Sequence, residues 1–84
     1  MAEEKKLVGK VTHYFTNIGV AVVELQDVLK VGDQISIEGA TTDVKQMVDS
    51  MQIEHEDVEE AKKGQSIGMK VKDRVREGDQ VFKI

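Results

Sequence analysis

The chain has 84 residues, of which 39% are hydrophobic and 33% are charged, and its net charge at pH 7 is −4. This length allows one domain with a thin core and leaves little room for an enclosed active site. The sequence has no cysteine, which excludes disulfides, thiolate metal sites and a thiol nucleophile, and it has no apolar run of the roughly 18 residues that a membrane span needs.

Residues 1–6 are mostly charged, and we expect them to form a flexible tail ahead of a single domain over residues 7–84. The charged start does not have the pattern of a signal peptide, so we expect a cytoplasmic location. From Leu7 onward, runs rich in Val, Ile and Thr alternate with glycines, which is typical of short strands joined by turns.

Six strands are predicted, over residues 7–15, 19–25, 34–38, 42–53, 66–76 and 79–84. In the first, Leu7, Gly9, Val11 and Phe15 are expected to share one face. In the fourth, the apolar positions change parity between Val44 and residue 53, which indicates a bulge or sharp bend of the kind found at barrel corners.

Residues 56–63 are the only helical candidate, because acids lie at the start of this stretch and lysines at its end, as the helix dipole favours. We expect a short helical turn there. Residues 30–35 and 76–81 match almost position by position, and residues 63–67 are a looser copy; each has a glycine that can adopt positive φ ahead of a strand. Short strands, glycine turns and the absence of proline predict a closed antiparallel barrel.

Five motifs occur in one order along the chain: Val-Gly-Lys-Val-Thr at 8–12, Leu-Lys-Val-Gly-Asp-Gln-Ile-Ser-Ile-Glu-Gly at 29–39, residues 44–53, Glu-Ala-Lys-Lys-Gly-Gln-Ser-Ile-Gly-Met-Lys-Val at 60–71, and Glu-Gly-Asp-Gln-Val at 77–81. This order resembles the second domain of elongation factor Tu and its relatives, the translation-protein β-barrel. The resemblance implies a six-stranded Greek-key barrel that contacts tRNA or the ribosome. Gly9-Lys10 lacks the upstream glycine of a phosphate loop, so no nucleotide cofactor is expected.

The chain is also similar to the C-terminal accessory barrel of collagenase-like peptidases. The two share the Val-Gly-x-Val start at Val8 and the Val-Gly-Asp turn at Val31, and Tyr14 and the strand from Gly19 fit this second family equally well. This similarity implies an accessory module that binds a protein partner. On sequence alone, both parentages stay open.

Four cations, Lys70, Lys72, Arg74 and Arg76, are spaced by two. In a strand they would line one face over roughly 20 Å and could contact RNA phosphates. Our main hypothesis is therefore a translation-factor-like domain that binds tRNA or the ribosome through this row. The alternative is a solvated face that prevents edge pairing, and the negative net charge argues against general nucleic-acid binding.

A protein-interaction module would use Tyr14 and Ile18 as contact residues. The acidic residues lie in one run without the spacing of a calcium loop, and we interpret the run as solvated: Glu54, Glu56, Asp57, Glu59 and Glu60. His13 and His55 have no spacing that would bring them together with a carboxylate, so no metal is expected. Without a nucleophile motif, the chain is expected to be a non-catalytic monomer with no cofactor.

Overall fold

The computed structural model describes residues 5–84, and this range contains ten strands and no helix. The strands are β1 (Lys6–Phe15), β2 (Val20–Leu25), β3 (Leu29–Lys30), β4 (Gln34–Glu38), β5 (Asp43–Met47), β6 (Met51–Ile53), β7 (Glu56–Val58), β8 (Glu60–Ala61), β9 (Ser66–Lys70) and β10 (Gln80–Lys83). The predicted all-β antiparallel class is confirmed. The expected tail at residues 1–6 falls mainly on residues 1–4, which lie outside the described residues, and Lys6 already belongs to β1.

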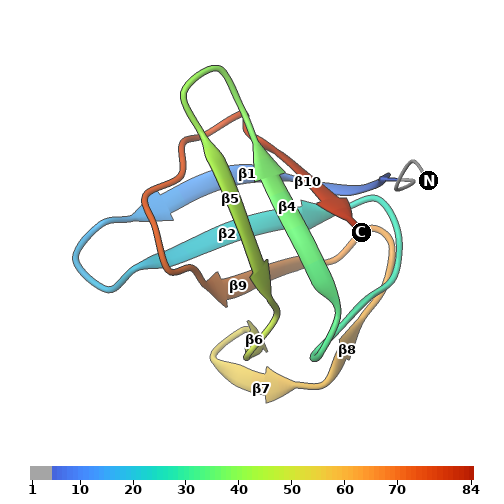
Figure 1. Cartoon of the computed structure of the whole chain (residues 1–84). Helices are drawn as coiled ribbons and strands as arrows, with labels where there is room; N and C mark the ends of the chain where they lie inside the picture. The colour runs from blue at the N-terminus through green and yellow to red at the C-terminus, as the bar shows by residue number, and fades with distance from the viewer. Residues whose placement is uncertain (1–4) are drawn as a thin grey trace.

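Eight antiparallel strands form one sheet in the order β5-β4-β10-β1-β2-β9-β6-β7, and β3 pairs with β8 in a separate ribbon. The sheet curls, so that β4 and β5 lie across β1, β2 and β9 (Figure 1). Apolar side chains from both halves of the curl fill the space between them, including Val11, Val23, Ile37 and Met69. The core is therefore inside the curl, and polar chemistry is confined to its outer surface and rims.

The stretch 42–53 bends as its change of parity predicted. It pairs with β4 as far as Met47, and from Met51 it pairs with β9 on the other side of the curl. Between them, Val48 bonds to a turn rather than to a strand. Because this bend divides the stretch into β5 and β6, and β7 is added beyond them, the main sheet has eight strands in place of the expected six.

The predicted helical turn at 56–63 is wrong, because this stretch forms β7 and β8. Glu54 and His55 have φ values of 51° and 68°, and Ile53 pairs with Glu56. Two successive residues with positive φ make a tight hairpin turn that folds β7 back along β6. Val58 then packs against the core from β7.

The predicted strand 66–76 is wrong beyond Lys70. β9 runs antiparallel to β2, and its last pair joins Lys70 to Val20, the first residue of β2. The next residues have no partner strand to extend the ladder, so 71–76 cross the end of the curl without regular structure. Val71 and Val75 remain buried in this segment.

Strand β1 contains two irregularities of register, between Leu7 and Gly9 and between Val11 and His13. A bulge adds one residue to a strand and reverses the face of every side chain that follows it. Tyr14 is therefore opposite the fully buried Ala21. The expectation that Val11 and Phe15 share a face is wrong, since Phe15 points outward.

Three glycine turns share one hydrogen-bonding pattern, and we call them the glycine corners: residues 30–33, 62–65 and 76–79. In each, the N–H of the fourth residue donates to the C=O of the first at 3.1 Å, and the fourth side chain accepts a hydrogen bond from the first N–H. The third residue is glycine, with φ of 97°, 89° and 93° in Gly32, Gly64 and Gly78. The turn chemistry predicted from the sequence is confirmed.

Each glycine corner also docks on one buried residue of another strand or bend. The glycine N–H donates to the C=O of that residue, and its N–H donates back to the C=O of the corner's fourth residue, at distances of 2.7–2.9 Å. The docked residues are Val48, Leu25 and Val11. The corners thus pin the chain at three places in the core.

Gly78→Ala is expected to lower the free energy of unfolding by about 1–2 kcal/mol, because a left-handed backbone is costly for alanine. No atom lies within 4 Å of the added Cβ, so the cost is conformational. Urea denaturation followed by circular dichroism measures it. Gly68→Ala is the matched control, since a Cβ there meets nothing nearer than 3.4 Å and φ is not positive; equal losses in the two variants would contradict the assignment.

Replacing Glu54-His55 by Asn-Gly is expected to stabilise the domain by about 1 kcal/mol and to raise its melting temperature by roughly 5 °C, because Asn and Gly adopt positive φ more readily. Differential scanning calorimetry gives the melting temperature. Glu59→Asn removes an equivalent charge from the same acidic run and controls for relief of repulsion. An unchanged or lower melting temperature in the Asn-Gly variant would show that the turn is not strained.

Candidate functional site

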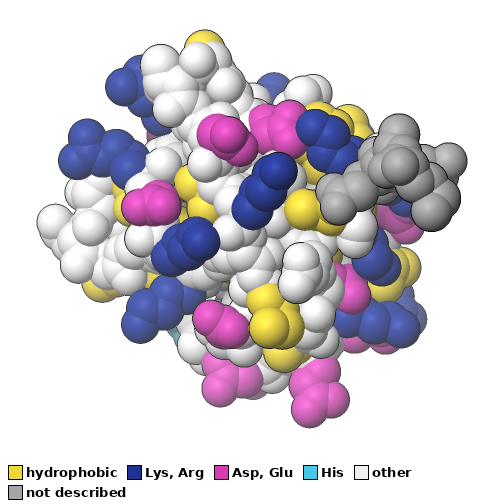
Figure 2. Space-filling view, viewed as in Figure 1, with side chains coloured by type: hydrophobic (Ala, Val, Ile, Leu, Met, Phe, Trp, Pro, Cys, Tyr) yellow, Lys and Arg dark blue, Asp and Glu magenta, His cyan; other side chains and the backbone are white. Residues whose placement is uncertain are grey.

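The four cations of the predicted row are all exposed, but they do not lie along one strand. Lys70 ends β9, whereas Lys72, Arg74 and Arg76 belong to the irregular segment that crosses to β10. Within residues 5–84, none of the four has a carboxylate within 4.0 Å. In Figure 2 basic side chains gather on the left of the molecule, where this segment runs in Figure 1, and acidic side chains gather at the end that holds β7.

Other cations of the chain are paired. Lys5 Nζ lies 2.7 Å from Glu38 Oε2, and Lys6 Nζ lies 2.5 Å from Asp27 Oδ2. The Lys6 hydrogen bond, and then the Val28 N–H, hold the pKa of Asp27 below its ordinary value. Hydrogen bonds from Lys5 and then Ser36 lower the pKa of Glu38 in the same way. These pairs tie β1 to its surroundings and leave the 70–76 segment as a separate source of positive charge.

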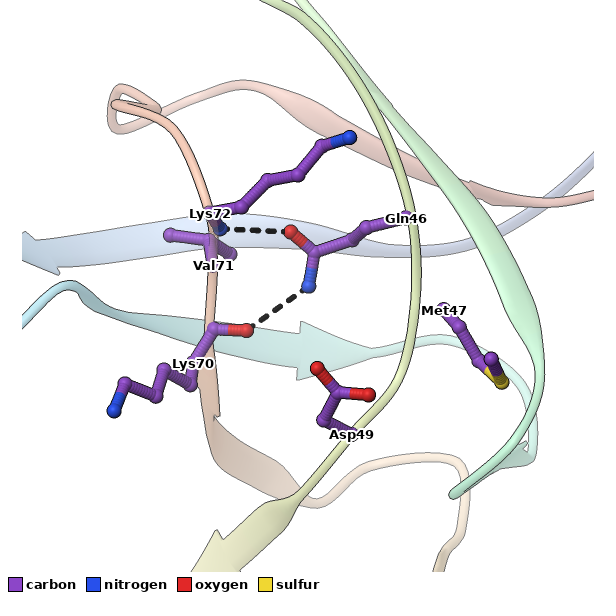
Figure 3. Close-up of a pocket in the computed structure, with 6 residues that line it drawn as sticks. All are labelled: Gln46, Met47, Asp49, Lys70, Val71 and Lys72. Atoms are coloured by element: carbon purple, nitrogen blue, oxygen red, sulfur yellow. Dashed lines mark hydrogen bonds between the residues drawn. The ribbon is translucent and has the colours of Figure 1, made fainter.

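An open groove of about 520 Å³ lies where β5 passes the start of the 70–76 segment. We call it the seam groove; it is lined by Gln46, Met47, Asp49, Lys70, Val71 and Lys72 (Figure 3). Gln46 spans it, since its Nε2 donates to the C=O of Lys70 at 3.0 Å and its Oε1 accepts from the N–H of Lys72 at 2.9 Å. One side-chain amide thus makes the two bonds that a neighbouring strand would make.

Sequence reasoning missed Gln46. A single glutamine in an expected strand carries no signal, because its partners lie 24 and 26 residues away in the chain. The cation spacing did point to Lys70 and Lys72, and the structure brings these two to one groove. Arg74 and Arg76 do not line it.

A second surface lies on the outside of the sheet, and we call it the outer apolar face: Phe15, Ile18, Val20, Val22 and Gly68. Phe15 is opposite Val20, and Val22 is opposite Gly68, and residues opposite each other share a face. Phe15 and Ile18 are 44% and 61% exposed. Gly68 has no side chain, and a shallow groove of about 260 Å³ lies over it.

The structure separates Tyr14 from Ile18. Tyr14 packs against the core from the inner face of β1, whereas Ile18 projects from the turn that joins β1 to β2. Phe15 takes the place expected of Tyr14, because the bulge after Val11 exchanges their faces. The His13 ring lies 4.5 Å from the Phe15 ring, and His13 Nδ1 lies 3.2 Å from Glu77 Oε2.

The remaining polar candidates are dispersed. His55 lies in the β6–β7 turn, away from the His13 and Glu77 contact, and residues 5–84 contain no group of three side chains placed to hold a metal. Of the acidic run, Glu60 lies 3.7 Å from Lys30 and Asp57 accepts a bond from Gln52, while Glu54, Glu56 and Glu59 are exposed. None of the elements described in residues 5–84 is a helix that could span a membrane.

No family model matches the chain. It is 49% identical over 76 residues to an uncharacterized protease of Methanocaldococcus jannaschii, and 42% identical over 82 residues to a collagenase of Porphyromonas gingivalis. These alignments cover 89% and 95% of the chain but only 19% and 23% of the relatives. The chain therefore spans about a fifth of the length of the curated relatives it matches.

The solved C-terminal domain of a putative U32 peptidase from Geobacillus thermoleovorans superposes with a TM-score of 0.88 at 21% identity. The match covers 94% of this chain and 92% of that one. The chain has the fold of that domain. A selenomethionine variant of the same domain gives a TM-score of 0.86 at 20% identity.

The translation-factor hypothesis is wrong, because the relatives are named protease and collagenase and the matched structure is a peptidase C-terminal domain. The resemblance to the accessory barrel of collagenase-like peptidases is supported instead. Val-Gly-Asp motifs misled the comparison with elongation factors because they encode a corner, with its glycine at positive φ, and carry no information on ligands.

Gln46→Ala is expected to lower the free energy of unfolding by about 1 kcal/mol, because it removes two hydrogen bonds across the seam. Urea denaturation measures the loss, and hydrogen exchange of the Lys72 amide should accelerate. Gln52→Ala is the control, since the Gln52 amide makes one exposed bond to Asp57. A smaller effect for Gln46→Ala than for Gln52→Ala would show that the seam is held by other contacts.

Proposed function

We propose that this chain is a non-catalytic accessory domain that docks on the peptidase part of a collagenase-like protein. The observation that supports this most is the 42–49% identity, over nearly the whole chain, to segments that make up about a fifth of proteins named protease or collagenase. The remaining four fifths of such proteins have room for the catalytic machinery. The apolar filling of the curl supports a binding role, because it leaves no internal cavity for chemistry among the described core residues.

The outer apolar face is the proposed docking surface. β2 has apolar side chains on both faces, with Ala21 and Val23 in the core and Val20 and Val22 outside. Strands apolar on both sides are typical of sheets covered on both sides. Ile18 and Phe15 extend this apolar surface beyond the end of β2, and contiguous exposed apolar groups mark interaction sites.

We also propose that β5 and β6 act as one bent strand, which would make the domain a six-stranded Greek-key barrel. Support comes from the pairing of β5 with β4 and of β6 with β9, with residues 48–50 between them. The Gln46 amide bonds add a link across the same seam. A closed barrel of this kind presents its partner with a stiff surface.

The Ile18→Asp variant is expected to weaken binding to the peptidase part at least about tenfold, because it places a charge in a desolvated apolar contact. The partner for the assay is the Methanocaldococcus jannaschii relative expressed without the segment that matches this chain. Isothermal titration calorimetry at low and high salt should give similar affinities, since an apolar contact is little screened.

Met47→Asp is the matched control, because Met47 is 49% exposed and lies outside the outer apolar face. Equal effects of the two variants would overturn the assigned surface. Absence of any binding by the unaltered domain, or hydrolysis of gelatin by the isolated domain, would overturn the proposed function itself.

A further inference from the structure

We propose that the seam groove binds an extended acidic peptide segment, at a site separate from the outer apolar face. The groove holds about 520 Å³ of open space beside Gln46. Its floor is already closed by the two Gln46 hydrogen bonds. A ligand therefore lies over the seam without having to separate the strands.

The charge around the groove favours an anionic ligand. Residues 70–76 contain four cations and one acid, in a chain with a net charge of −4. Lys70 and Lys72 line the groove, and neither lies within 4.0 Å of a carboxylate in residues 5–84. Such unpaired cations attract a complementary partner and select it against neutral ones.

The directions of the two lysines favour a long ligand over a single anionic group. Figure 3 shows the Lys72 side chain reaching toward β5, whereas the Lys70 side chain points away from the gap. Lys70 is opposite Val20, so it stands at the border with the outer apolar face. A ligand that meets both ammonium groups must cross the 70–72 segment and carry negative charge at two places.

Two features favour a peptide over a nucleic acid. The Asp49 carboxylate points into the same gap (Figure 3), so a uniformly charged backbone would be repelled at that end. No aromatic ring lines the groove to stack on a base; its exposed apolar side chain is Met47, which is 49% exposed. A peptide can place glutamates over the lysines, an apolar residue over Met47 and a neutral residue beside Asp49.

The test is an NMR titration of the ¹⁵N-labelled domain with a blocked hexapeptide of alternating glutamate and alanine. The expected result is movement of the Gln46 side-chain amide signals and of the Lys70 and Lys72 backbone signals. The same peptide with lysine in place of glutamate should move none of them. Lys72→Glu should weaken binding about fivefold or more, since it reverses a charge that lines the groove.

Lys62→Glu is the matched control, because it makes the same change in net charge at an exposed lysine of a glycine corner outside the groove. Equal weakening by the two variants would reduce the binding to general charge attraction and overturn the site. Tighter binding of an oligouridylate of equal charge at the same amides would assign the groove to nucleic acid. The same signal changes on concentrating the domain alone would assign it to a second copy.

Failure of peptide binding leaves the docking proposal intact, because the Ile18→Asp experiment involves no residue of the seam groove. Loss of docking with retained peptide binding would overturn only the accessory-domain proposal. The two outcomes are therefore distinguishable.

Discussion

The fold depends on the reciprocal main-chain bonds between the three glycine corners and Val11, Leu25 and Val48. Each of these residues is buried, so its N–H and C=O need partners inside the protein. A corner supplies both at once, and its glycine makes the tight approach possible without strain. Because each corner also starts a new strand, the same contact that satisfies the core sets the direction in which the chain leaves it.

Closure of the curl depends on a weaker device. β5 and β9 are not joined by a ladder, and the gap next to the corner at 30–33 is bridged by one glutamine side chain. This arrangement leaves an open groove on one rim, while β2 keeps an apolar surface on the outside of the sheet. The two proposed binding surfaces thus arise where the sheet is least regular and where it is most apolar.

Residue pattern alone predicted the strands with buried partners well. β2, β4 and β10 begin and end within one residue of the expected bounds, and the parity change in 42–53 located the bend. It failed where the outcome is decided by contacts distant in sequence. The alternation of Lys70 to Arg76 persists although β2 has ended, and the bulge in β1 exchanges Tyr14 and Phe15 with no local sign. The charge pattern of 56–63 suits a helix, but two residues with positive φ impose a hairpin.

The pairing of Lys6 with Lys83 places the first and last strands of the sheet side by side and antiparallel. A chain that enters at one of these strands leaves at almost the same spot from the other. The domain can therefore be inserted within a larger polypeptide as readily as appended to it, with little displacement of the sequences on either side. The same geometry makes it a suitable candidate for circular permutation, with a short linker joining the old ends and a new opening at the exposed β1–β2 turn.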